Sequence, residues 1–377
     1  MDFDFSDDQE MLRESVRRWV EKSYGFEARR KTVAAGGFSK EAWKGLADLG
    51  LLGLQVPEAE GGVGFGAVDA MVIMEELGRG LVLEPYAPVA LVATHLLAAA
   101  PAGQALLSRL AGGDAIVVLA QEERHSRYRL SHVETKAEGS GDACQLTGTK
   151  IVVPAGAAAD AFIVSARTTG GADDGSGVAL FLVEKNAPGV RVRPYPTQDG
   201  AAAADLVLDG AGARLLLPAG QAMDALETAV DIGIAGLCAE AVGAMDALVK
   251  LTVEYMNTRK QFGVTIATFQ ALRHRMADVK MQLELARSMS YFASLKLGEP
   301  AAARRRALSQ AKVQLGQSMR YVGQQCIQLH GGIGVTDEYA ASHYFKRLTV
   351  MEMTFGDTLH HLGEVSARMQ DTAGVFA

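Results

Sequence analysis

The spacing of hydrophobic residues divides the chain into three regions. Residues 1–113 follow a helical period, with Ser6 and Ser39 as predicted helix N-caps. Residues 114–220 instead carry short apolar runs of strand length. The helical period returns in residues 221–377 and persists. We therefore expect an N-terminal helical domain, a middle β domain and a C-terminal helical domain.

The middle region contains strand-like runs separated by Gly- and Asp-rich breaks, including residues 139–142 and 170–174. The runs are residues 116–120, 144–147, 151–153, 161–165, 178–183, 190–192 and 204–208. Because no helical segment intervenes, we predict an antiparallel barrel or sandwich rather than a βαβ sheet.

The last region predicts three long helices, starting near Gln221, Thr268 and Ala302, followed by one or two more. Long helices joined by short turns are typical of an antiparallel four-helix bundle. The predicted fold class is α+β, mainly α.

The third long helix ends in the stretch Gln328-Leu329-His330-Gly331-Gly332-Ile333-Gly334. Paired glycines at a helix end supply a positive φ and bare backbone. This favours either a simple cap and turn, or a site where another molecule approaches the main chain. A second segment, Arg259-Lys260-Gln261-Phe262-Gly263, precedes Gln270 and favours the interpretation as a binding site.

Composition narrows the possible functions. The net charge of −7 and the pI near 5.7 argue against a nucleic-acid surface, which needs clustered Lys and Arg. The acidic N-terminus lacks the features of a secretory signal, and no membrane-spanning run is expected. Cys144, Cys238 and Cys326 lie far apart without metal-ligand spacing, which predicts buried thiols in a reducing cytoplasm and no metal site.

With these segments in place, the chain resembles the acyl-CoA dehydrogenase family along nearly its whole length. That family has an N-terminal helical domain, a middle β domain and a C-terminal four-helix bundle. The motifs that carry the resemblance are Gly50-Leu51-Leu52-Gly53 with Pro57-Glu58, Gly148-Thr149-Lys150, Phe181-Leu182-Val183, Tyr255 with Arg259 and Phe262-Gly263, Phe269-Gln270, and Gln328 to Gly334.

The resemblance implies a flavoprotein that removes an α-proton and a β-hydride from an acyl-CoA thioester. It implies FAD as cofactor, held at its ADP end by an arm that crosses a subunit boundary. Carried over to this chain, the FAD-binding residues are Arg259, Phe262, Gln270, Gln328, Gly331 and Gly332, with Asp357 as a further candidate. For Phe262, packing in the core is the alternative to a flavin contact. The implied partners are an electron-transfer flavoprotein and other subunits in a homo- or hetero-oligomer, either a dimer or a tetramer.

The chain departs from the family pattern at the catalytic base. Most members place a Glu about 27 positions after the first Gln of the glycine motif, and this position is Phe355. A minority place it on the helix before the Arg motif, at a position occupied here by Gly233. The phenyl ring of Phe355 cannot accept a proton. Asp357 and Glu352 are the nearest carboxylates, with helix capping and ion pairing as their structural alternatives.

Contacts to the flavin ring and to CoA are also missing. Gln121-Glu122-Glu123 replaces a Thr-Glu-Pro motif, and Val152 and Pro154 replace a Trp and a Thr. The Arg expected three residues after Asp231 is Ile234. The pattern resembles the small subunits of two-component enzymes, such as pimeloyl-CoA dehydrogenase, and related hetero-oligomers act on steroids. Two other interpretations stay open: an active homo-oligomer with a relocated carboxylate, and a non-catalytic subunit that binds FAD or acyl-CoA.

The histidines near these segments have structural interpretations of their own. His330 can interact with the carbonyls at its helix end. His360 and His361 are adjacent on a predicted helix, so their side chains point about 100° apart. At most one of the pair is expected to face a site.

Overall fold

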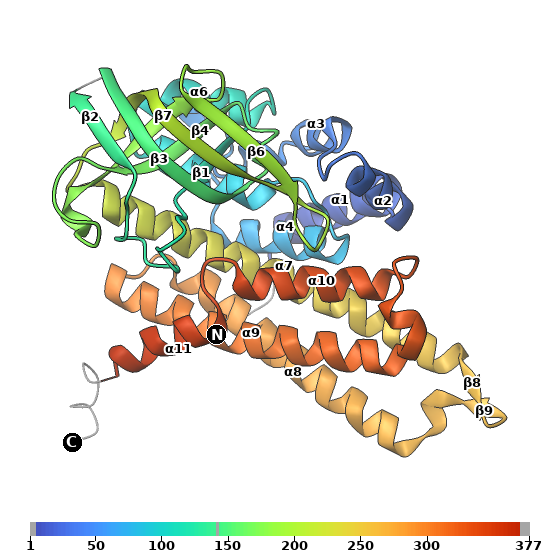
Figure 1. Cartoon of the computed structure of the whole chain (residues 1–377). Helices are drawn as coiled ribbons and strands as arrows, with labels where there is room; N and C mark the ends of the chain where they lie inside the picture. Colours follow the sequence, from blue (N-terminus) through green and yellow to red (C-terminus); the bar gives the residue numbers. More distant parts are fainter. Residues whose placement is uncertain (1–4, 141–142, 370–377) are drawn as a thin grey trace. The chain divides into compact units, whose positions relative to one another are not determined.

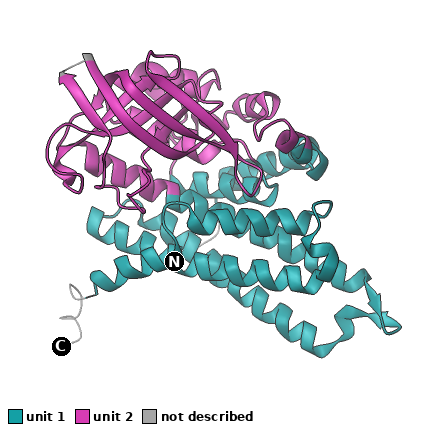
Figure 2. Cartoon of the chain, viewed as in Figure 1, with its two compact units in different colours: residues 1–30, 67–82, 234–377 teal, residues 31–66, 83–233 magenta. Residues whose placement is uncertain are grey.

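The computed structural model describes residues 5–140 and 143–369. Residues 1–4 of the acidic N-terminus and residues 141–142 of a predicted break lie outside this description. The chain forms two compact units, coloured separately in Figure 2. Unit 1 comprises residues 1–30, 67–82 and 234–377, and unit 2 comprises residues 31–66 and 83–233.

Unit 1 is built from long helices, labelled in Figure 1. They are α1 (Asp7–Ser23), α4 (Ala67–Arg79), most of α7 (Ala222–Thr258), α8 (Gln270–Lys296), α9 (Ala301–His330), α10 (Ala340–Met353) and α11 (Thr358–Ala367). Helix α9 packs against α8, α10 and α11 and is the central helix of this bundle. The predicted long C-terminal helices are confirmed to within a few residues at each end.

Both predicted N-caps are confirmed. At the start of α1, Ser6 Oγ accepts a hydrogen bond from the Gln9 backbone N–H at 3.2 Å, and Gln9 Oε1 accepts one from the Ser6 N–H at 3.1 Å. This reciprocal pair satisfies two N–H groups that a helix start leaves without partners. Ser39 caps α3 (Lys40–Asp48) by accepting from the Ala42 N–H at 3.2 Å.

Helix α7 has the length and apolarity of a membrane span. However, 83% of its most apolar stretch is buried. Part of that burial comes from a crossing with α4 at which the two backbones nearly touch. A Cβ on Gly243 would lie 1.8 Å from the Glu75 carbonyl oxygen, and one on Gly78 would lie 2.0 Å from that of Glu240. Glycine at both positions allows a closer approach than any side chain permits.

Unit 2 contains α3, α5 (Thr94–Ala98), α6 (Pro101–Ala111) and a mixed β-sheet, while α2 (Phe26–Ala34) spans the boundary between the units. A π-helical segment, Ala87–Ala93, precedes α5. The strands are β1 (Val117–Ala120), β2 (Lys136–Ser140), β3 (Ala143–Pro154), β4 (Ala161–Arg167), β5 (Val178–Glu184), β6 (Val190–Pro196) and β7 (Ala202–Leu217).

The sheet of unit 2 closes on itself. Its strand order is β1-β4-β2-β3-β7-β5, and β5 also pairs with β4, which completes a ring, while β6 pairs with β7. The predicted barrel is therefore correct. The prediction of wholly antiparallel pairing is wrong, because β1 runs parallel to β4. Strand β2 was not predicted, and two of the predicted strands are parts of the single long strand β3.

A buried ion pair lies inside unit 2. Lys150 Nζ is 2.6 Å from Glu123 Oε1 and donates to Ser165 Oγ at 3.0 Å. Glu123 also accepts from the Thr135 hydroxyl at 2.6 Å and from the Thr135 N–H at 3.0 Å. Burial opposes ionisation of Glu123, but Lys150 and these hydrogen bonds outweigh it and hold its pKa below the usual value. The pair thus fixes residues 121–135 against β3 and β4.

The α4–α7 crossing generates a stability prediction. Gly243→Ala must push the two helices apart, and we expect a loss of about 1–3 kcal/mol in the free energy of unfolding. Gly298→Ala is the matched control, because a Cβ there meets nothing within 4 Å. Urea denaturation at one fixed protein concentration measures both. Equal stability of the two variants would contradict the crossing geometry.

Candidate functional site

The Arg259 segment forms a short hairpin that leads from α7 into α8, at one end of the bundle (Figure 1). Strand β8 (Lys260–Gln261) pairs with β9 (Val264–Thr265), and the turn residues Phe262 and Gly263 have φ values of 54° and 83°. Two successive positive φ angles are typical of the type I′ turn that connects tightly paired strands. The sequence analysis did not predict this hairpin.

A hydrophobic cluster joins the hairpin to the end of α9. Met256 of α7, Ile266 after the hairpin and Leu329 of α9 are buried together. Tyr255, Ala267, Phe269, Leu272 and Met276 pack around them. The cluster therefore brings the three segments with the predicted FAD-binding residues, the hairpin, the start of α8 and the glycine stretch, to the same end of unit 1.

The predicted cofactor residues at this end face outward. Arg259, Gln270, Gln328, Gly331 and Gly332 are all exposed. Within residues 5–140 and 143–369, no hydrogen bond or ion pair engages the side chains of Arg259, Gln270 or Gln328. Phe262 is 93% exposed, with its ring edge-to-face against Phe269 at 6.2 Å between centroids. Packing of Phe262 in the core of this chain is therefore ruled out.

The paired glycines differ in what the fold requires of them. Gly331 has φ 64°, a left-handed conformation that L-residues rarely adopt and glycine adopts freely. A Cβ on Gly332 would meet no atom within 4 Å, and φ is not in the left-handed region there. Nothing within the described chain requires glycine at position 332. Bare, open backbone of this kind suits a molecule that approaches from outside.

His330 has a structural role next to this stretch. The ring is buried, its Nδ1–H donates to the Cys326 carbonyl at 2.8 Å, and it lies between the rings of Tyr255 and Tyr339. Burial lowers the pKa of His330. The neutral ring therefore packs the helix end and adds no charge to the exposed cluster.

Residue 355, where the family resemblance implies a catalytic base, lies in a tight turn between α10 and α11. Phe355, half-buried, has φ 58°, and Gly356 follows with φ 109°. Asp357 is the N-cap of α11, where its carboxylate accepts from the His360 N–H at 2.8 Å. Glu352 is buried and accepts from the Thr358 hydroxyl at 2.6 Å, the Thr358 N–H at 3.1 Å and Arg320 at 3.2 Å. Both nearby carboxylates are thus engaged in holding the turn.

Two further groups hold this turn, and the sequence analysis did not single out the first. Lys312 of α9 is fully buried and donates to the carbonyls of Met351, Glu352 and Gly356 at 2.8–2.9 Å. His361 Nε2–H donates to the Phe355 carbonyl at 3.0 Å, and its Nδ1 accepts from Ser309 at 3.2 Å. A lysine among the apolar positions of α9, between Leu308 and Leu315, was the available signal.

Unit 2 carries the positions expected to contact a flavin ring. The backbone of Glu122 accepts from the Ile151 N–H at 2.8 Å, so residues 121–123 lie beside the end of β3. Val152 sits in a β-bulge with φ 52° and is 51% exposed, and its N–H donates to Tyr195 Oη at 3.0 Å. Burial raises the pKa of the Glu122 carboxyl. An aliphatic side chain therefore stands in this bulge, where the family resemblance implies an aromatic one.

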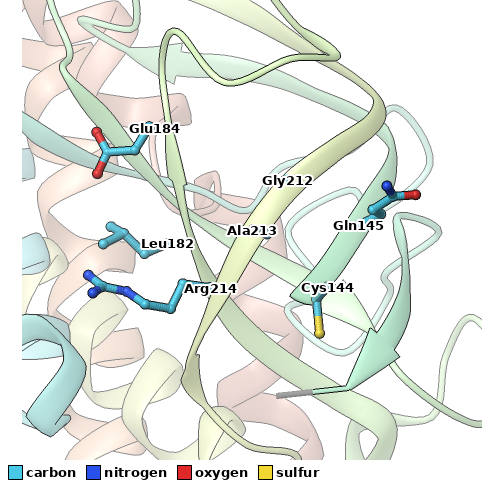
Figure 3. Close-up of a pocket in the computed structure, with 7 residues that line it drawn as sticks. All are labelled: Cys144, Gln145, Leu182, Glu184, Gly212, Ala213 and Arg214. Atoms are coloured by element: carbon cyan, nitrogen blue, oxygen red, sulfur yellow. The ribbon is translucent and has the colours of Figure 1, made fainter. Parts of the chain in front are cut away.

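A depression of about 510 Å³ on unit 2 does not involve any predicted site residue (Figure 3). Its walls come from β3, β5 and β7, and they carry both charged and apolar side chains. The lining residues are Cys144, Gln145, Leu182, Glu184, Gly212, Ala213 and Arg214.

All three cysteines of the chain are buried thiols, as predicted.

Comparison with known proteins gives matches along the chain. The family models for the N-terminal, middle and C-terminal domains of acyl-CoA dehydrogenase match residues 6–113, 119–210 and 221–370. Acyl-CoA dehydrogenase IpdE2 of Mycobacterium tuberculosis is 31% identical over 343 residues, which cover 90% of this chain and 91% of that protein.

Solved structures agree with these matches. The ChsE4–ChsE5 complex from Mycobacterium tuberculosis contains a chain with a TM-score of 0.86 and 26% identity, covering 98% of this chain and 99% of that one. The Tcur3481–Tcur3483 steroid ACAD gives a TM-score of 0.88 and 28% identity, with the same coverage.

The turn between α10 and α11 generates a pH prediction. Burial, helped by the Lys312 charge, lowers the pKa of His361 from 6.5 to about 3. Between pH 6.5 and about pH 3, His361 therefore carries a proton in the unfolded chain that it does not carry in the folded chain. This contribution to stability is complete above pH 6.5 and is lost as the pH falls, by about 1.4 kcal/mol per pH unit.

His361→Gln keeps an N–H donor for the Phe355 carbonyl but cannot be protonated. We expect this variant to lose less stability than the wild type between pH 7.5 and pH 5, as measured by urea denaturation. His274→Gln, at an exposed position of α8, is the control and should follow the wild type. An unchanged slope in His361→Gln would show that His361 is not the buried neutral group described.

Proposed function

Because the chain belongs to the acyl-CoA dehydrogenase family, whose members are flavin-dependent oxidoreductases, we propose that it is the small subunit of a two-component enzyme. In this proposal the chain supplies an arm for the ADP end of FAD and lacks a catalytic base of its own. A partner chain supplies the base. The reaction is the α,β-dehydrogenation of an acyl-CoA.

One observation carries the proposal. Arg259, Gln270 and Gln328 lie on segments that meet at one end of the bundle, and their side chains are exposed and without partners in the described chain, while the position expected for the base holds Phe355. A chain that had lost its function altogether would have no reason to retain this set of outward-facing groups. A chain with its own active site would retain a free carboxylate.

The exposed groups fit the phosphate-rich half of FAD. A guanidinium such as that of Arg259 donates a fork of N–H groups that matches pyrophosphate oxygens. The amide side chains of Gln270 and Gln328 can donate and accept, and the open backbone at Gly331 and Gly332 allows close approach. When bound, the isoalloxazine ring of FAD accepts the hydride. The residues of this chain bind and orient the other end of the cofactor.

An active homo-oligomer with a relocated base is less well supported. Asp357 caps α11, and Glu352 is buried with three donors on one carboxylate oxygen. Using either as a base would remove hydrogen bonds that hold the turn. A non-catalytic assembly subunit is the remaining alternative, and it predicts no effect of this chain on FAD retention.

An exposed apolar stripe on α8 favours assembly with another subunit. Met281, Leu285 and Leu295 are 53%, 43% and 52% exposed on a helix that starts at Gln270, within the cofactor end. Apolar side chains in a row on an outer helix face are typical of a covered interface. A chain of the solved ChsE4–ChsE5 complex matches this chain along its length, and by analogy we propose a hetero-oligomer here.

The remaining parts of the proposal follow from the family. The substrate is an acyl-CoA, the electron acceptor is an electron-transfer flavoprotein, and the compartment is the cytoplasm. One of the matched structures is described as a steroid ACAD, which makes bulky acyl groups the first substrates to try. We further propose the domain boundaries 1–113, 114–220 and 221–377.

Substitution of Arg259 tests the arm directly. In the complex co-purified from the native host, Arg259→Met should weaken FAD binding by about ten- to a hundredfold, the loss expected for charge-assisted hydrogen bonds. Flavin absorbance per complex and titration of the stripped complex with FAD measure this. Arg18→Met is the control, since Arg18 is an exposed arginine of α1 with only a Glu14 ion pair. Equal FAD affinity in both variants would exclude the arm.

A further inference from the structure

The depression on unit 2 lies over a glycine in the middle of three strands. Gly212 of β7 pairs with Gln145 of β3. On the other side of β7, Arg214 pairs with Leu182 of β5, and extending this register by two residues places Glu184 opposite Gly212. Residues opposite one another share a face of the sheet. The bare backbone of Gly212 therefore lies between the side chains of Glu184 and Gln145 (Figure 3).

The fold does not require a glycine at position 212. A Cβ there would meet no atom within 4 Å, and the φ of Gly212 lies outside the left-handed region. Glycine inside a strand weakens the strand, and a common reason for its presence is the close approach of a ligand or another backbone. The space that this glycine leaves open belongs to a depression of about 510 Å³, which is within the range of small-ligand sites.

Three side chains around this floor have hydrogen-bonding groups to spare. Glu184 and Gln145 are exposed, and within the described residues neither side chain makes a hydrogen bond or an ion pair. Arg214 is also exposed, and its guanidinium donates to the Ala102 carbonyl of α6 at 3.2 Å. This contact uses one of the five N–H groups of the guanidinium, so the others remain available to a ligand.

The acidic and the basic group of the depression stand apart. Glu184 and Arg214 occupy diagonal positions on neighbouring strands, which are typically about 7–8 Å apart. No ion pair joins them in the described part of the chain, and Leu182 lies between them in Figure 3. An ammonium suits the Glu184 carboxylate, and a carboxylate suits the forked donors of Arg214. The depression therefore fits a molecule that carries both charges, one at each end.

We propose that this depression binds a small zwitterion of about dipeptide length. An extended dipeptide spans about 7 Å, which matches the diagonal spacing of Glu184 and Arg214. In this arrangement the ligand backbone lies over Gly212, and its amide group faces Gln145, whose side chain can both donate and accept. The site lies within unit 2 and does not depend on the proposed role in flavin binding.

Titration of the full chain with glycyl-leucine, followed by saturation-transfer NMR, tests the site. We expect a dissociation constant of about 1–10 mM, as a ligand of this size allows. N-acetyl-glycyl-leucine lacks the ammonium and glycyl-leucinamide lacks the carboxylate, so each should bind about fivefold more weakly or worse. Free leucine spans only about 3.5 Å and should bind as weakly as these. Absence of glycyl-leucine binding up to about 50 mM, or equal affinity for all four probes, would overturn the proposal.

The variant Gly212→Leu locates the site. Its side chain fills the space over β7, and we expect glycyl-leucine to bind about tenfold more weakly or worse. Gly298→Leu is the matched control, because a Cβ at Gly298 also meets nothing within 4 Å, and it should bind as the wild type does. Equal affinity of the two folded variants for glycyl-leucine would overturn the proposal.

The variant Glu184→Gln tests the ammonium contact and also decides the matter if Gly212→Leu does not fold. It keeps the size of the side chain and removes its charge. We expect affinity for glycyl-leucine to fall about five- to twentyfold, and affinity for N-acetyl-glycyl-leucine, which has no ammonium, to stay within about twofold. Glu58→Gln, at another exposed carboxylate of unit 2, is the control and should change neither. Equal losses for the two peptides, or no loss for either, would overturn the proposal.

Discussion

The burial of α9 is the constraint on which both functional segments of unit 1 depend. Near its middle, the ammonium of Lys312 and the hydroxyl of Ser309 reach the turn between α10 and α11. In its last turn, Leu329 packs with Met256 and Ile266 and so holds the hairpin and the start of α8. One helix therefore determines the position of the segments proposed to bind the cofactor and of Phe355. A shift of α9 would displace both.

The two segments differ in how far their residues match what the family resemblance implies. At the bundle end, the exposed groups suited to a dinucleotide are present, and the buried residues beneath them are apolar and well packed. At position 355, where the family resemblance implies a proton acceptor, the chain has a phenylalanine, and the carbonyls of residues 351, 352, 355 and 356 accept hydrogen bonds from Lys312 and His361. In unit 2, Val152 has a left-handed φ in the bulge of β3, and its side chain offers a flavin neither an aromatic face nor a hydroxyl.

Sequence patterns predicted the elements of this fold better than they predicted their contacts. Hydrophobic period and caps gave the long helices, because the apolar face of each helix repeats over many turns. Strand β2 escaped prediction, since its sequence, Lys136-Ala137-Glu138-Gly139-Ser140, contains no large apolar side chain. The parallel pairing of β1 with β4 also escaped, because the partner of a strand depends on residues more than 40 positions away.

The residues of the candidate site could likewise be predicted from the sequence, but their contacts could not. Arg259, Gln270 and Gln328 were identified because a motif names them, and the structure places the segments that carry them at the same end of unit 1. The hydrogen-bond partners of Glu352 and Asp357 could be found only from the structure, because a carboxylate in the sequence can serve equally as a helix cap or as a catalytic base. Lys312 stands out in the sequence as a cation among apolar positions, but only the structure shows that its ammonium donates hydrogen bonds to three backbone carbonyls.

The central claim is that this chain contributes to a flavin site without completing one. Anaerobic addition of acyl-CoA, followed by loss of the oxidised flavin absorbance, tests it in two preparations: this chain alone with FAD, and the complex co-purified from the native host. The account predicts rapid bleaching in the complex and none above background in the chain alone. Bleaching by the isolated chain at the rate of the complex would contradict it.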